Sequence, residues 1–166
     1  MVLIRSYSEK TSHIKNSILL LISVFLDRFQ GLRFLPIEID ITLAVLFFIL
    51  MYSEESLPIW FVFFAGLLND SLSGAPLGQS TFALLVFYML IDQNKKFLTQ
   101  SDLSIQWVYL GFCITVFELI VWFFSCLFSQ TLLSIGPVFE ASGKTFLVYP
   151  FIYLLLKKLI IKQRFR

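Results

Sequence analysis

Long apolar runs follow one another along most of this chain, separated only by short polar breaks or by breaks that contain glycine and proline. Hydrophobic residues make up 58% of the 166 positions and charged residues 14%, whereas soluble domains average roughly 45–50% apolar and about 25% charged residues. The chain has too few polar side chains to face water on all sides, so lipid must surround most of it. We therefore expect an all-α, polytopic membrane helical bundle of about six transmembrane helices.

The apolar runs are predicted to form a single integral-membrane domain over residues 1–166. Pro58 is well placed to begin a helix, and the segment Gly74-Ala75-Pro76-Leu77-Gly78 cannot continue one. Gly136-Pro137 is expected to form a turn within a polar loop that runs from Ser129 to Gly143. The spans are approximately 13–27, 39–52, 58–73, 79–91, 105–128 and 145–161.

Basic residues predict how these spans are oriented. Of the 13 Lys and Arg residues, ten lie in the N-terminal tail, in the connection after the fourth span and in the C-terminal tail. Because cytoplasmic segments carry the excess of positive charge, both termini are expected in the cytoplasm. The charge count does not distinguish a full crossing by residues 58–92 from a re-entrant hairpin, since both ends of either emerge on the same side.

Several kinds of chemistry have no residues to support them. The single histidine, His13, lies in the polar N-terminal tail, so a His-based metal site or a Ser-His-Asp triad within the membrane is excluded. Cys113 and Cys126 point to nearly opposite faces of one helix, as core-filling thiols do. The basic residues are too scattered for a nucleic-acid surface. We expect no catalytic residue, metal or cofactor.

The third predicted span carries the most informative pattern. Gly66, Asp70 and Gly74 are spaced four residues apart and therefore share one helix face, with Asn69 and Ser73 beside it. Small residues let a second backbone approach closely, and a carboxylate in lipid needs a hydrogen-bond partner. We expect close helix packing at Gly66 and Gly74 and an interhelical hydrogen bond at Asp70. The alternative is a solvated Asp70 at the membrane surface beside the turn.

A second acidic residue, Glu118, lies near the centre of the fifth predicted span. A charged side chain at that depth costs about 2.5–3.5 kcal/mol or more if it faces lipid. It must face the bundle or stay protonated. No Lys or Arg lies at a matching depth in another span, which favours a hydrogen bond within the chain or to a partner helix over ion transport.

The segment from Gly66 to Gly78 closely resembles the signature of the rod shape-determining protein MreD family, in which a helix of the form G-L-x-x-D-x-x-x-G is followed by x-P-L-G. Weaker similarities are Pro36-Ile37-Glu38 at the second span, a W-x-x-x-G-F pattern from Trp107 to Phe112, and Tyr149-Pro150 before the basic tail. The resemblance covers residues 36–166. The interaction or packing motif that it implies comprises Gly66, Asn69, Asp70, Ser73, Gly74, Pro76 and Gly78.

The resemblance implies a non-catalytic inner-membrane subunit that binds MreC. With RodA, its transpeptidase partner and, indirectly, the MreB filament, such a subunit helps to organise side-wall peptidoglycan synthesis and rod shape. A substrate-binding component of an energy-coupling-factor transporter has a similar length and six spans, but it needs a polar pocket. A lipid-modifying enzyme needs several aspartates around a metal, and Asp70 is the only one within residues 57–91. The adaptor is the preferred interpretation.

The predicted topology is testable with reporter fusions. An alkaline phosphatase or fluorescent protein joined after Arg166 is expected to report a cytoplasmic C-terminus, because most basic residues lie on that side. A fusion in the Ser129–Gly143 connection is expected to report the opposite side. An external C-terminus would contradict the topology.

Overall fold

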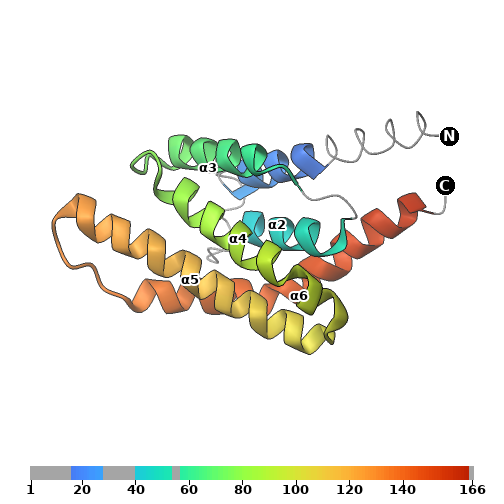
Figure 1. Cartoon of the computed structure of the whole chain (residues 1–166). Helices are drawn as coiled ribbons and strands as arrows, with labels where there is room; N and C mark the ends of the chain where they lie inside the picture. The colour runs from blue at the N-terminus through green and yellow to red at the C-terminus, as the bar shows by residue number, and fades with distance from the viewer. Residues whose placement is uncertain (1–15, 28–39, 54–56, 165–166) are drawn as a thin grey trace.

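A computed structural model describes residues 16–27, 40–53 and 57–164, with side chains as far as residue 154, and in this part of the chain all regular structure is helical (Figure 1). The all-α class is therefore confirmed for the described residues. The helices are Asn16–Asp27, α2 (Ile41–Tyr52), α3 (Ile59–Ser73), α4 (Gln79–Gln100), α5 (Leu103–Ser129) and α6 (Gly136–Arg164).

The boundaries of α3 and α4 follow from residues with restricted or unusual backbone angles. Pro58 precedes α3 in an extended conformation, and its fixed φ suits a helix start. Gly74 ends α3 with a φ of 69°, and Gly78 precedes α4 with a φ of 100°. Both angles lie in the left-handed region that glycine adopts without steric cost. The glycine- and proline-containing segment therefore forms the break that the sequence predicts.

The end of the fourth helix differs from the prediction. The apolar run ends at Ile91, but α4 continues through Asp92 and Lys96 to Gln100. This polar segment contains neither glycine nor proline, and its Gln and Lys residues are good helix formers. Its polarity thus marks where the helix leaves the apolar region and not where the helix ends.

The start of the last helix also differs. The predicted start at residue 145 and the predicted turn at Gly136-Pro137 are both wrong, because α6 begins at Gly136. Proline is tolerated in the first turn of a helix, where its missing N–H would have had no partner. The connection between α5 and α6 is consequently only residues 130–135. Of the first predicted span, residues 13–15 lie outside the described residues.

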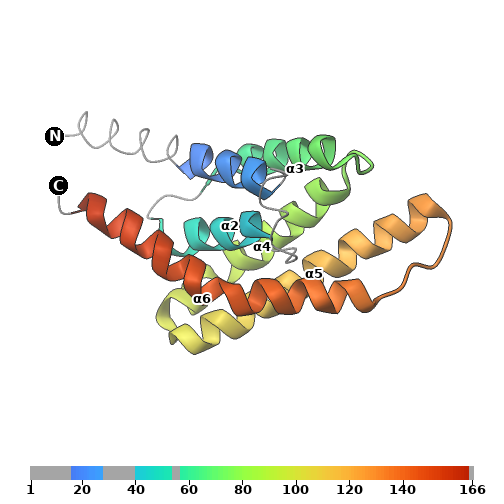
Figure 2. The ribbon, with the colours of Figure 1, turned by 180° about the vertical axis from the view of Figure 1, so that it is seen from behind.

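Helix α2 forms the centre of the bundle. All of its residues from Thr42 to Met51 are buried, and it packs against α4 and α6. The later helices pack in chain order, α3 on α4, α4 on α5 and α5 on α6, and Figures 1 and 2 show this succession from opposite sides. Helix α4 therefore contacts α2, α3 and α5 and connects the centre to the periphery.

The contact between α5 and α6 is held by aromatic packing. The rings of Trp107 and Phe146 stack with centroids 4.8 Å apart, and the Trp107 indole N–H donates to the Phe146 carbonyl. A Cβ at Gly111 would lie 2.8 Å from the Phe146 ring, so the glycine makes room for the stack. The W-x-x-x-G part of the sequence pattern is thus a helix-packing device.

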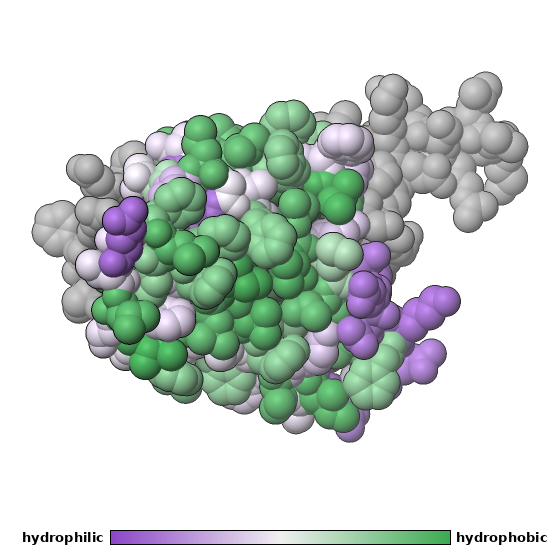
Figure 3. Space-filling model, turned by 60° about the vertical axis from the view of Figure 1, so that its left-hand side comes forward, coloured by the Kyte–Doolittle hydropathy of each residue, from purple (hydrophilic) through white to green (hydrophobic). Residues whose placement is uncertain are grey.

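Only α5, among the described helices, is both long enough and apolar enough to cross a membrane unaided, with 27 residues and a mean hydropathy of 2.1 over an 18-residue stretch. Helix Asn16–Asp27, α2 and α3 are apolar but shorter. Hydrophobic residues cover the middle of the face in Figure 3, and hydrophilic residues gather towards its two sides. The bundle is helical and largely apolar. That six of its helices cross the membrane completely is still a prediction.

Candidate functional site

The predicted motif lies in the hairpin formed by α3 and α4, and its acidic residue faces the interior. Asp70 is fully buried, although it is in the last turn of α3 beside the connection to α4. Thr81, in the first turn of α4, is also buried. The alternative of a solvated Asp70 at the membrane surface is therefore wrong.

The Asp70 carboxylate accepts hydrogen bonds from the start of α4. Its Oδ1 accepts the Ser80 N–H at 2.8 Å. Its Oδ2 accepts the Gly78 N–H at 2.8 Å, the Thr81 hydroxyl at 2.9 Å and the Thr81 N–H at 3.4 Å. We call this set of four hydrogen bonds the Asp70 cap.

The Asp70 cap solves a general problem of helix starts. The first N–H groups of a helix have no partner within it, and an unpaired buried N–H costs about 1–3 kcal/mol. A carboxylate at this position also interacts favourably with the positive end of the helix dipole. A helix N-terminus is a natural anion site, and here the anion is a side chain of the preceding helix.

Gly66, one helical turn before Asp70, lies where the backbones of α3 and α4 approach closely. A Cβ at this position would lie 2.5 Å from the Cα of Thr81, which is far closer than any non-bonded contact of two carbons. Thr81 therefore contacts α3 twice, with its backbone at Gly66 and with its N–H and hydroxyl at Asp70. The helical spacing of these two residues correctly predicts that they share one face.

Gly74 does not have the role that the spacing predicts. A Cβ at Gly74 would have no neighbouring atom within 4 Å, so no second backbone approaches it. The residue lies beyond the end of α3, where helical spacing no longer applies, and its φ of 69° explains the glycine instead. Gly78 combines a φ of 100° with the N–H that Asp70 accepts. The Pro76 carbonyl accepts the Gln79 N–H at 3.2 Å and closes the turn.

The remaining motif residues play lesser parts in the hairpin. Asn69 is buried beside Asp70. The Ser73 hydroxyl donates to the carbonyls of Asn69 and Asp70 within its own helix and makes no hydrogen bond to another described helix. Glu118 is half-buried on α5 and takes part in an interaction within the structure.

A second carboxylate cap was not predicted from the sequence. Asp27, the last residue of the first described helix, accepts the N–H groups of Ile41 and Thr42, each at 2.9 Å, and the Thr42 hydroxyl. These donors belong to the first turn of α2. The shared signal is an Asp at the end of one helix and a Thr in the first turn of the next.

Gln79 was also not singled out from the sequence. It joins the α3–α4 hairpin to α5. Its Nε2 donates to the Val121 carbonyl at 3.0 Å and to the Ser125 hydroxyl at 2.7 Å. Its Oε1 is buried and accepts no hydrogen bond from the described residues. The start of α4 is thus fixed on one side by Asp70 and on the other by α5.

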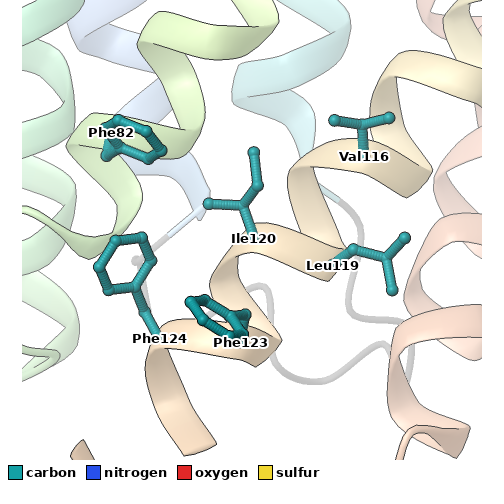
Figure 4. Close-up of a pocket in the computed structure, with 6 residues that line it drawn as sticks. All are labelled: Phe82, Val116, Leu119, Ile120, Phe123 and Phe124. Carbon is teal, nitrogen blue, oxygen red and sulfur yellow. The ribbon is translucent and has the colours of Figure 1, made fainter. Parts of the chain in front are cut away.

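A pocket of about 430 Å³ lies on the outer surface of α4 and α5 (Figure 4). It is lined by Phe82, Val116, Leu119, Ile120, Phe123 and Phe124. None of these side chains carries a polar group. The pocket therefore offers nothing that would select a polar small molecule.

A largely apolar helical bundle whose buried polar side chains are hydrogen-bonded, apart from Gln79 Oε1 among the described residues, is typical of helical membrane proteins. The family model of the rod shape-determining protein MreD matches residues 15–159, and the chain belongs to this family. The family expected from the motif is thus confirmed, and membership of it suggests a role in determining rod shape. The comparison with curated proteins gave no match, and neither did the comparison with solved structures.

Substitutions at the two glycines are expected to act through different causes. Gly66→Ala must separate α3 from α4, and such overpacking costs about 1–3 kcal/mol. Gly74→Leu strains the backbone by about 1–2 kcal/mol without a clash, and Gly74→Asn, which tolerates a positive φ, should recover most of that loss. The measurement is the thermal unfolding midpoint of the purified chain in detergent, with Leu67→Ala as a reference. If Gly66→Ala left the midpoint unchanged, the close approach would be refuted.

The Asp70 cap predicts a graded response to substitution. Asp70→Leu leaves three N–H groups and one hydroxyl without an acceptor, at about 1–3 kcal/mol for each buried donor. Asp70→Asn keeps one acceptor oxygen and should give an intermediate unfolding midpoint. Thr81→Val, which removes only the hydroxyl donor, should be the mildest of the three. Equal midpoints for Asp70→Leu and Thr81→Val would contradict the capping role.

Proposed function

We propose that this chain is a non-catalytic inner-membrane subunit of the cell-elongation machinery, which binds MreC and helps to organise side-wall peptidoglycan synthesis. Its further partners would be RodA with its transpeptidase partner and, indirectly, the MreB filament. Membership of the MreD family supports a role in rod shape. The single observation that carries the adaptor mechanism is the Asp70 cap, because it uses the carboxylate of the family motif to hold two helices together.

The hydrogen bonds of Asp70 favour an adaptor over a carrier. Both carboxylate oxygens are engaged by donors of the same chain, so the charge serves the fold instead of a transported cation. The apolar lining of the pocket beside Phe82 points in the same direction. An adaptor needs a rigid surface, and the fixed start of α4 supplies it by orienting α3 and α5 on either side.

The motif residues then act on partner binding through the shape of the α3–α4 hairpin. Gly66 and Asp70 set how closely α3 lies against α4, and Gly74, Pro76 and Gly78 set the turn between them. Helix association in lipid depends on close packing and on hydrogen bonds worth about 0.6–2 kcal/mol each. A change in the hairpin of a few ångströms would therefore alter any surface that includes α3.

The proposal is tested by co-purification from a rod-shaped host whose own MreD has been removed. The wild-type chain is expected to recover MreC and restore normal cell width, whereas Asp70→Leu should reduce both and Asp70→Asn should do so less. Leu67→Ala is the matched control on α3, and membrane levels of each variant are measured in parallel. Failure of the wild-type chain to recover MreC, or normal rods and MreC recovery with Asp70→Leu, would refute the proposal. A growth defect that depends on one nutrient would favour the carrier.

A further inference from the structure

The α3–α4 hairpin and the α5–α6 hairpin end at different heights along the axis of the bundle. Gln79, the first residue of α4, donates to Val121 and Ser125 of α5, so the start of α4 lies beside these residues. Helix α5 continues from there to Ser129. Four to eight further residues at about 1.5 Å each extend it by about 6–12 Å. Figures 1 and 2 both show the α5–α6 connection lying beyond the turn between α3 and α4.

The opposite end of the bundle gives a common reference level. The Asn94 amide donates to the Tyr109 hydroxyl, which donates to the Leu90 carbonyl, each at 2.9 Å. From Tyr109 to Gln130, α5 extends about 32 Å, close to the hydrocarbon thickness of about 30 Å. From Asn94 back to Gly78, α4 extends only about 24 Å. Measured from this common level, the turn between α3 and α4 therefore lies about 8 Å short of the α5–α6 connection.

The polar groups on the α4 side of this turn are satisfied from within. The N–H groups of Gly78, Ser80 and Thr81 donate hydrogen bonds to the Asp70 carboxylate. The exposed hydroxyls of Ser71 and Ser73 donate to carbonyls of α3. Such internal pairing is required where water is absent.

Apart from the hydroxyls of Ser71 and Ser73, which are paired within α3, the side chains that the turn exposes are apolar. Leu72 is 45% exposed and Leu77 is 70% exposed, and Asp70, which is buried, is the only charged residue between Ile59 and Ile91. The α5–α6 connection on the same end exposes Leu132 as well, but it also exposes the polar side chains of Gln130 and Thr131. The exposed Glu140 forms an ion pair with Lys144 at 2.5 Å just beyond this connection.

From these observations we propose that the turn from Ser71 to Gly78 lies inside the hydrocarbon layer, where Leu72 and Leu77 contact lipid acyl chains. The α3–α4 hairpin is then a re-entrant element that does not cross the membrane, whereas α5 crosses it completely. The Asp70 cap is what allows a helix start to lie at that depth. This inference rests on membership of a membrane-protein family and not on the proposed binding of MreC.

The test measures the depth of single labelled cysteines in the full-length purified chain. Cys113→Ala and Cys126→Ala remove the native thiols, and Leu77→Cys or, as the matched control, Leu132→Cys in the α5–α6 connection carries a bimane fluorophore. Leu132 is 92% exposed. The protein is reconstituted into vesicles of phosphatidylcholine and phosphatidylglycerol, with nitroxide-labelled acyl chains as the lipid quencher and iodide as the aqueous quencher.

The label at Leu77→Cys is expected to be quenched at least twofold more by the lipid nitroxide than the label at Leu132→Cys, with the reverse order for iodide. Equal iodide quenching at both positions would place the turn in water and overturn the proposal. Quenching of the Leu77→Cys label by neither reagent would mean that protein, such as a second copy of the chain, covers the turn, and would also overturn it. Leu72→Cys provides the same reading if Leu77→Cys does not fold.

Discussion

The N–H groups at the start of a helix need acceptors, and lipid provides none. In this protein the acceptor for α4 is the carboxylate of Asp70, which belongs to the preceding helix. Since α4 packs against α2, α3 and α5, the position of its first turn affects the central helix and both of its flanking helices. The arrangement of the bundle thus depends on one buried acidic side chain whose charge is matched by backbone dipoles.

The same arrangement occurs twice in the chain. Asp27 caps α2 as Asp70 caps α4, and in each case a threonine hydroxyl in the first turn of the capped helix adds a donor. The Lys95 ammonium donates to the Ser53 carbonyl at 3.4 Å, which brings the C-terminal parts of α2 and α4 together. Both caps therefore lie at the opposite end of the bundle. The pair formed by helix Asn16–Asp27 and α2 and the pair formed by α3 and α4 are therefore both held together by an aspartate that caps the second helix.

The sequence predicts the parts of this site that depend on local geometry. Gly66 and Asp70 share a helix, so a spacing of four residues correctly places them on one face. Gly74 has the same spacing but follows the helix end, and only its backbone angle explains it. The Asp27 cap could not be read from a local pattern, because its donors at Ile41 and Thr42 come after an intervening segment. Pro137 was read as a helix breaker, although a first-turn proline is compatible with the helix it begins.

The caps also bear on the biosynthesis of the protein. Asp70 emerges from the ribosome before the donors of α4, so α3 alone carries a carboxylate with none of its final partners. A charged residue without partners is costly in a lone helix on insertion, whereas in the completed hairpin the hydrogen bonds from α4 offset this cost. Helix α3 therefore gains by waiting at the insertion machinery for α4, so that the two helices enter the bilayer as one unit.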